Sequence, residues 1–227
     1  RVAAGAIAKL LLNELNIDIK SGICEIDGIK ADNFNFENAR NSEIFALDSN
    51  VEDAQKNAIL KAKNSHNSVG GVALINVKNC PVGLGEPIYH KLDAQIANAM
   101  MSINAVKAVE IGDGILASRV LGFDNNDQIR KSGFKTNHSG GILGGISNGD
   151  DINVKVYFKA TPSIFIEQET VDIYGNEVEC KLKGRHDPCV AIRGSVVAES
   201  MISLVIADML LLNMSSKVEN IKKVYAK

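Results

Sequence analysis

The stretch NHSGGILGGISNGDD (residues 137–151) runs directly into INVKVYF (residues 152–158). Five glycines within ten residues give the first segment a backbone that can adopt positive φ and approach a flat ligand closely. The second segment alternates apolar and polar side chains, the pattern of a strand with one buried face. The pair predicts an ordered strand that begins at a glycine-rich ligand cradle, with GRHDP (residues 184–188) as the expected partner of that cradle.

Glycines at this density also occur in purely structural turns, and both interpretations of residues 137–151 stay open. The spacing G-G-x-x-G-G differs from the G-x-G-x-x-G of dinucleotide-binding folds, and no apolar strand directly precedes it. The P-loop pattern G-x-x-x-x-G-K-[ST] does not occur in the sequence. A dinucleotide-binding fold and a P-loop nucleotidase are therefore disfavoured.

Helical and strand periodicities alternate in the part of the chain that precedes this stretch. Apolar side chains on most sides of the first helix predict that it is largely buried, and Pro87 suits the first turn of a later helix. The Asn-rich segment 32–49 reads as a polar surface excursion. The predicted helices span residues 1–15, 51–64 and 86–101, and the predicted strands lie within residues 17–29, 69–77 and 105–111.

Short antiparallel pieces and one long helix are predicted after residue 158. The helix, at residues 190–214, is apolar nearly all round and should therefore lie between layers rather than on a surface. The short pieces fall at residues 163–168, 171–174 and 178–182. The whole pattern predicts a mixed α/β or α+β architecture that forms a single domain over residues 1–227.

Composition narrows the class of protein. The chain has 227 residues, 45% of them hydrophobic, and a formal net charge of −2 without a basic block, which argues against non-specific binding of nucleic acid. Its most apolar stretch, residues 201–212, contains Asp208 and is too short to span a membrane. The four cysteines are widely spaced, so neither a zinc site nor a disulfide framework is expected, and a reducing cytoplasm is the simplest location.

GRHDP places three ionisable side chains in a turn. Arg185 could bind a phosphate in bidentate fashion, and Asp187 could accept a proton if its surroundings tune its pKa. A surface ion pair at a strand-to-helix connection explains the same residues equally well.

Two further segments carry polar candidates. His138 could donate a proton or simply occupy a turn, and KATPS (residues 159–163) puts Lys159, Thr161 and Ser163 at a strand end, where phosphate binding competes with a plain polar turn. His66 and His90 have no carboxylate or second histidine at metal-ligand spacing, so no metal site is predicted.

Four blocks, in this order along the chain, resemble bacterial chorismate synthase from residue 1 to about residue 209. They are PVGLGEP (81–87), MSINAVKAVEIGDG (101–114), TNHSGGILGGISNGDDI (136–152) and GRHDPCVAIR (184–193). The resemblance implies a lyase that converts the small molecule 5-enolpyruvylshikimate 3-phosphate to chorismate and phosphate, a trans 1,4-elimination that needs reduced FMN without net redox change. It also implies a homotetramer with a β-α-β sandwich fold, in which helices lie between antiparallel sheets.

The resemblance also assigns site residues. Asp187 matches the aspartate proposed to transfer a proton with flavin N5, and His138 is taken as a second catalytic candidate. Family members usually read K-P-T-S-S where this chain reads K-A-T-P-S. The implied flavin contacts are Asn104, Ala105, Gly144, Lys159, Ala160, Thr161, Pro162, Ser163 and Arg185.

Part of the family pattern has no counterpart in this chain. A G-E-S-H-G type motif and the arginines that hold the substrate phosphate are missing, so we expect the chain to lack roughly the N-terminal third, to bind flavin weakly and not to turn over substrate alone. The resemblance also associates NADP with the family, whereas the sequence shows no nicotinamide fingerprint, which favours an external source of reduced flavin. Two alternatives remain open: a binding module for another flavin or phosphate ligand, and an oligomerisation domain without catalysis.

Overall fold

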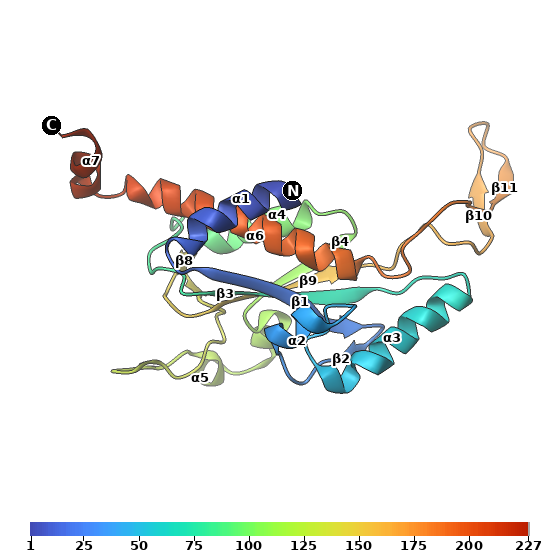
Figure 1. The fold of residues 1–227 in the computed structure, drawn as a ribbon, viewed down its shortest axis with the longest axis horizontal. Coiled ribbons are helices and arrows are strands. Elements are labelled where there is room, and N and C mark those ends of the chain that lie inside the picture. The colour runs from blue at the N-terminus through green and yellow to red at the C-terminus, as the bar shows by residue number, and fades with distance from the viewer. Residues whose placement is uncertain (227) are drawn as a thin grey trace.

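A five-stranded antiparallel sheet lies at the centre of the computed structural model, which describes residues 1–226 (Figure 1). Its strand order is β2-β1-β3-β9-β4. Mixed helices and strands around an antiparallel sheet confirm the predicted α+β class. The five strands are β1 (Asp18–Ile26), β2 (Ile29–Lys30), β3 (Gly71–Lys78), β4 (Val106–Ile111) and β9 (Ile152–Phe158).

β9 is the strand predicted from the alternating stretch, and it lies between β3 and β4. Its register pairs Ile152 with Val77 of β3 and Val154 with Ile111 of β4. Alternate side chains from Ile152 to Phe158 are buried, as the pattern predicts. Because β9 is paired on both sides, the segments at its two ends are held at fixed positions.

Helices α1 (Val2–Asn13), α4 (Leu92–Met101) and α6 (Ala191–Met214) cover one face of the sheet (Figure 1). α6 contacts β1, β3 and β9, so the predicted apolar helix is a core helix. A Cβ at Gly194 would lie 2.5 Å from the ring of Phe158. Glycine at that position therefore allows α6 to lie close on β9. Within residues 1–226, α6 is also the one helix long and apolar enough to cross a membrane by length and composition.

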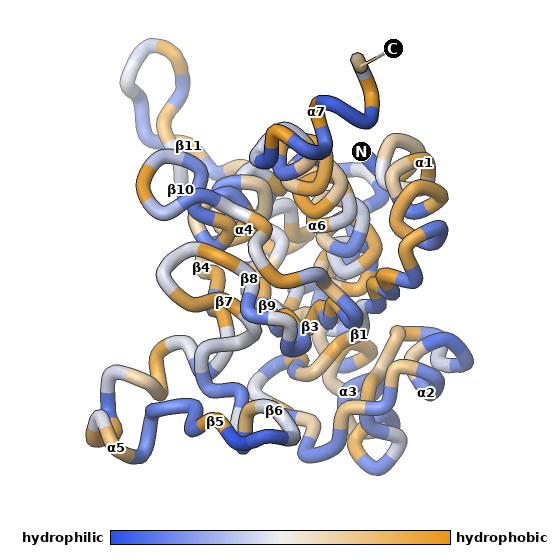
Figure 2. The backbone as a smooth tube through the Cα atoms, turned by 90° about the vertical axis from the view of Figure 1, so that its left-hand side faces the viewer, coloured by the Kyte–Doolittle hydropathy of each residue, from blue (hydrophilic) through white to orange (hydrophobic). Residues whose placement is uncertain are grey.

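α1 does not match the prediction that the first helix is largely buried. Its buried residues are Gly5, Ala8 and Leu12, whereas Ile7 and Leu10 are 70% and 67% exposed. The helix packs on α6 and β1, which meet one side of it only. Hydrophobic side chains of α1 are consequently exposed, and Figure 2 shows this largely hydrophobic helix at the edge of the molecule.

Residues 32–49 are not the polar surface excursion that their composition predicts. They contain α2 (Phe36–Asn41) and a buried stretch that includes Leu47, and α3 (Ser49–Asn64) begins at their end. The carboxylate of Asp48 accepts backbone hydrogen bonds from residues on both sides of it in sequence, which closes the segment on itself. α3 confirms the helix predicted at residues 51–64.

The helix predicted at residues 86–101 begins only at Leu92. Before it, the Glu86 N–H donates to the His90 carbonyl at 2.9 Å, and the Leu92 N–H donates to the Gly145 carbonyl at 2.7 Å. These bonds hold residues 86–91 in a turn tied to the glycine stretch, and Ile88 is 72% exposed there. A contact distant in sequence therefore overrides the local helical pattern.

A two-stranded hairpin of β10 (Gln168–Val171) and β11 (Glu177–Cys180) projects from the body (Figure 1). The predicted piece at residues 163–168 is almost entirely outside β10, and the piece at residues 171–174 is mostly the hairpin turn. The remaining elements are η1 (Gly114–Arg119), α5 (Gly122–Asn125), β5 (Ile129–Arg130), β6 (Gly133–Phe134), β7 (Ile142–Leu143), β8 (Ile146–Ser147) and α7 (Val218–Tyr225).

Candidate functional site

The glycine stretch folds into a small hairpin in which β7 and β8 are joined by Gly144 and Gly145. Their φ angles of 62° and 88° fit a two-residue turn that only glycine and a few other residues adopt readily. A Cβ at Gly144 would meet nothing within 4 Å, whereas one at Gly145 would lie 2.6 Å from the Lys91 side chain. Gly144 therefore faces open space and is accessible to a ligand.

A second part of the glycine stretch packs backbone on backbone. The Gly112 N–H donates to the Asn153 carbonyl at 2.9 Å, and the Asp113 N–H donates to the His138 carbonyl at 2.8 Å. A Cβ at Gly140 would lie 2.5 Å from the Gly112 Cα. Some of the glycines are thus required by close chain contact, so the structural interpretation of this stretch is correct for them.

His138 is held by two aspartates. Its ring Nδ1 lies 2.7 Å from Asp113 Oδ2, and its backbone N–H donates to Asp127 Oδ1 at 2.7 Å. Burial alone would raise the pKa of Asp127, but hydrogen bonds from Ser139, His138 and Thr136 outweigh burial and lower that pKa. No sequence pattern indicated either aspartate as a site residue, although Asp113 lies in the block MSINAVKAVEIGDG (residues 101–114) that resembles the family.

The other end of β9 gathers most of the predicted flavin contacts. The Lys159 N–H donates to the Ala105 carbonyl at 2.9 Å, which places the segment of Asn104 and Ala105 beside the start of KATPS. The Ser68 hydroxyl donates to the Thr161 carbonyl at 2.7 Å. β3 and β9 therefore bring three loops of the chain together.

A cavity of about 300 Å³ lies next to this region, lined by side chains from residues 63–68, 163–165 and 184–188, and we call it the Arg185 cavity. Its walls include two predicted site residues from GRHDP and Ser163 from KATPS, and also three residues that sequence reasoning did not assign to a site. The six are Ser163, Arg185 and Asp187, together with Lys63, His66 and His186.

Charge in the Arg185 cavity is not balanced by the protein. Asp187 Oδ2 is 3.2 Å from Arg193 Nη1, so the ion pair that the sequence left open does form. Within residues 1–226, neither Arg185 nor Lys63 has an ion-pair partner. The cavity consequently offers two positive charges to an anionic ligand.

Two buried polar atoms near this cavity also lack partners. Thr161 Oγ1 and His186 Nε2 are buried, and nothing in residues 1–226 forms a hydrogen bond with them. A buried polar atom without a partner typically costs about 1–3 kcal/mol. A bound ligand that supplies hydrogen bonds would recover that free energy.

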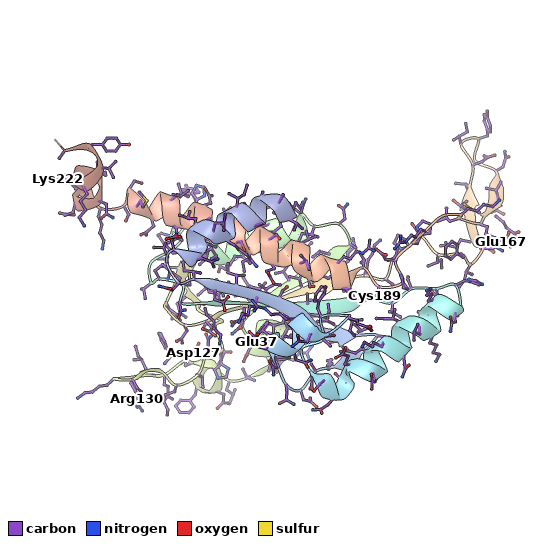
Figure 3. All side chains as sticks on the ribbon, viewed as in Figure 1. Glu37, Asp127, Arg130, Glu167, Cys189 and Lys222 are labelled. Carbon is purple, nitrogen blue, oxygen red and sulfur yellow. The ribbon has the colours of Figure 1, made fainter. Side chains whose placement is uncertain are left out.

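The structure does not bring the glycine stretch and GRHDP together. β9 separates them, and a strand of its seven residues is about 20 Å long. His138 and Gly144 lie at the end of β9 that carries Ile152, whereas KATPS and GRHDP lie at the end that carries Phe158. In Figure 3, Asp127, which binds the His138 backbone, and Cys189, which follows GRHDP, lie in separate parts of the molecule.

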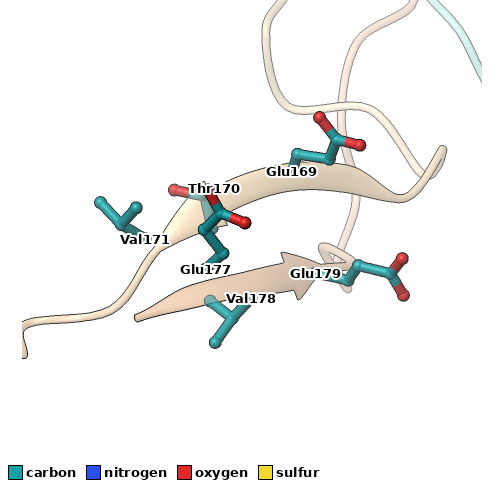
Figure 4. Close-up of a pocket in the computed structure, with 6 residues that line it drawn as sticks. All are labelled: Glu169, Thr170, Val171, Glu177, Val178 and Glu179. Carbon is teal, nitrogen blue, oxygen red and sulfur yellow. The ribbon is translucent and has the colours of Figure 1, made fainter. Parts of the chain in front are cut away.

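A larger hollow of about 510 Å³ lies on the β10–β11 hairpin, and six side chains of that hairpin line it (Figure 4). Three of the six are the glutamates Glu169, Glu177 and Glu179. All three are exposed and would repel a phosphate-bearing ligand. The Arg185 cavity is therefore the better candidate.

The cysteines take no part in these sites. All four are free, and burial raises the pKa of the Cys24 thiol to about 12 and that of Cys80 to about 11. Burial also raises the pKa of Cys189, which directly follows GRHDP. These three thiols are uncharged at neutral pH and unreactive.

Comparison with known proteins gives a consistent result. The family model described as chorismate synthase matches residues 1–211. A chorismate synthase of Aliarcobacter butzleri (strain RM4018) is 82% identical over 227 residues, and one of Sulfurimonas denitrificans (strain ATCC 33889 / DSM 1251) is 63% identical over 227 residues. Both alignments cover 100% of this chain and 63% of the relative, so the chain spans less than two thirds of their length.

A solved structure titled "Crystal Structure of Chorismate Synthase" has the same fold. It superimposes with a TM-score of 0.78 at 31% identity, over 97% of this chain and 65% of that one. The family match, the identities and the fold agree. This chain belongs to the chorismate synthase family.

Proposed function

We propose that this chain provides the FMN-binding part of a chorismate synthase, which eliminates phosphate from 5-enolpyruvylshikimate 3-phosphate to form chorismate in the cytoplasm. The observation that carries the proposal is the Arg185 cavity, with two unpaired cations beside buried polar atoms that lack partners. A phosphate-bearing ligand such as FMN fits that chemistry.

The residues at this end of β9 would hold FMN by charge and hydrogen bonding. Arg185 and Lys159 would balance the negative charge of the cofactor, and Thr161 Oγ1 would gain the hydrogen bond that it lacks in the protein alone. Ala105, which is held at a φ of 71°, would present backbone rather than a bulky side chain. The chemistry that reduced FMN would supply, held by these residues, is electron density for the substrate as phosphate leaves.

Asp187 is the proposed proton acceptor. Arg193 Nη1 lies 3.2 Å from the Asp187 carboxylate, and this ion pair orients the carboxylate. His138 remains a candidate proton donor at the opposite end of β9. Because about 20 Å of strand separates the two, both could contact one ligand only if that ligand is elongated or if another copy of the chain supplies one of them.

Gly144 is another proposed flavin contact. It is exposed and has free space where a side chain would be, so a ligand can reach its backbone. Its distance from KATPS again requires an elongated ligand or a second copy of the chain.

We propose a homotetramer, which the exposed apolar side of α1 supports, and light scattering during size-exclusion chromatography would test it.

Anaerobic titration of reduced FMN, with and without 5-enolpyruvylshikimate 3-phosphate, tests the proposed function. We expect weak but saturable FMN binding that the substrate strengthens, because both ligands would occupy adjoining parts of one site. An FMN affinity that does not change when the substrate is added would instead support the alternative of a flavin-binding module without catalysis. Absence of FMN binding by a chain with the expected circular dichroism spectrum would contradict the proposal.

A further inference from the structure

We propose that His66, together with Lys63, binds the phosphate group of the ligand in the Arg185 cavity. The proposal rests on the function proposed for that cavity and adds two residues that neither the sequence motifs nor the family resemblance points to. His66 lies just beyond the last turn of α3, and Lys63 lies in that turn.

His66 occupies a backbone position where glycine is the usual residue. Its φ is 58°, and its N–H donates to the Lys63 carbonyl at 3.1 Å, while the Asn67 N–H donates to the Ala62 carbonyl at 2.8 Å. This pair of bonds defines the Schellman end of a helix, whose left-handed residue is most often glycine. Histidine is less stable than glycine in that conformation.

The side chain of His66 forms part of the cavity wall. Its ring lies edge-on to Phe165, with centroids 6.2 Å apart and planes at 83°, and Phe165 in turn contacts His186 at 5.5 Å. The Phe165 N–H donates to the His66 carbonyl at 3.1 Å. Three rings therefore follow one another along the wall, and His66 is fixed at one end of the row.

The charges around His66 select an anion. Lys63 and Arg185 line the same cavity and have no ion-pair partner within residues 1–226, while the one carboxylate of the cavity wall, Asp187, is already paired with Arg193. The negative end of α3 is weakened, because backbone N–H groups of Ser65, His66 and Asn67 satisfy its last carbonyls. An imidazole donor beside two free cations fits a phosphate group.

Replacement of His66 by glycine separates ligand binding from a purely structural role, because it should raise Tm but lower the affinity for the ligand. His66→Gly should raise Tm by relieving the left-handed backbone. It should also weaken binding of both inorganic phosphate and FMN about tenfold, as expected for the loss of a hydrogen bond to a charged group. Binding would be measured by titration calorimetry on the 227-residue chain.

Three further variants sharpen the test. His66→Asn keeps a residue that tolerates the left-handed conformation but removes the ring, so it should lose affinity without the added flexibility of glycine. Lys63→Gln should lower phosphate affinity several-fold and leave Tm nearly unchanged. His90→Ala is the matched control, because it removes an exposed histidine that does not line this cavity and should alter neither quantity.

The possible outcomes are distinct. A higher Tm with unchanged affinity for phosphate and FMN would show that His66 is only a helix-end residue, and would overturn this inference without touching the proposed function. Phosphate binding that depends on His66 in a chain that does not bind FMN would support the inference and contradict the proposed function. A wild-type chain that binds neither ligand would overturn both.

Discussion

Asp113 and His138 form a hydrogen-bonded pair, with Asp113 Oδ2 at 2.7 Å from His138 Nδ1, although 25 residues separate them in sequence. Both side chains are about one third exposed, at 31% and 29%. A carboxylate at this distance favours the tautomer in which Nδ1 carries the proton and donates it to Asp113. Nε2 is then the nitrogen left for other partners.

Asp113→Asn should remove the preference of the His138 ring for the tautomer with its proton on Nδ1. We expect the wild-type ring to carry its proton on Nδ1 when neutral, and the variant to show a mixture of both tautomers, because an amide can accept or donate. Long-range ¹H–¹⁵N NMR of the imidazole reports the tautomer directly. Asp124→Asn, at an exposed position nearby in sequence, is the control. An unchanged tautomer in Asp113→Asn would show that the carboxylate does not orient the ring.

Asp127→Asn should make the protein less stable at neutral pH, with Tm lower by about 3 °C. The pKa of Asp127 is lowered in the folded protein, so its contribution is complete above the ordinary aspartate pKa of about 3.9 and is lost as the pH falls through the folded value. The difference in Tm between wild type and variant should therefore shrink below about pH 4. Melting curves from pH 3 to pH 7 would show this, and a constant difference would contradict it.

Gly194→Val should destabilise the contact between α6 and β9. A Cβ at this position lies 2.5 Å from the Phe158 ring, which has no space to withdraw because Phe158 is 3% exposed. Overpacking of this kind costs about 1–3 kcal/mol, which lowers Tm by roughly 2–12 °C. Gly122→Ala is the matched control, because a Cβ there meets nothing within 4 Å. Equal melting temperatures for the two variants would refute the close contact.

Arg185→Ala should lower the affinity for FMN about tenfold, because it removes one of two unpaired charges in the cavity. Arg185→Lys should recover only part of that loss, since lysine keeps the charge but not the bidentate fork. Arg119→Ala removes an exposed arginine outside the cavity and should bind FMN like wild type. Fluorescence titration with FMN measures all three, and full affinity in Arg185→Ala would remove Arg185 from the site.

Local sequence patterns correctly predicted the elements in which apolar and polar residues recur with a clear helical or strand period. Apolar and polar residues alternate strictly in β9, α3 has a clear polar face, and α6 is apolar nearly all round. Each element begins and ends within two residues of its predicted bounds. The predicted start of α4 was wrong by six residues, because Leu92 is anchored by the Gly145 carbonyl, a partner 53 residues away. No local pattern carries that information.

The candidate site was likewise predicted only where local motifs carry the information. Motifs identified Arg185, Asp187 and Ser163, and the structure places all three on one cavity. The sequence could not show that β9 keeps this group apart from His138, nor that Lys63 and His66 would join it from the end of a distant helix. One local signal for His66 existed, because a polar residue that follows a helix end often takes the conformation that glycine prefers.

The position of β9 in the sheet also governs how the protein folds. β3 and β4 do not pair with each other, and the strand between them is the last of the five to be synthesised. Until it arrives, both neighbours present open hydrogen-bonding edges, and the contacts that close the sheet join distant parts of the chain. Folding should therefore be slow, with a rate-limiting step in which β9 inserts into the gap, and the nascent chain is most exposed to aggregation before that insertion.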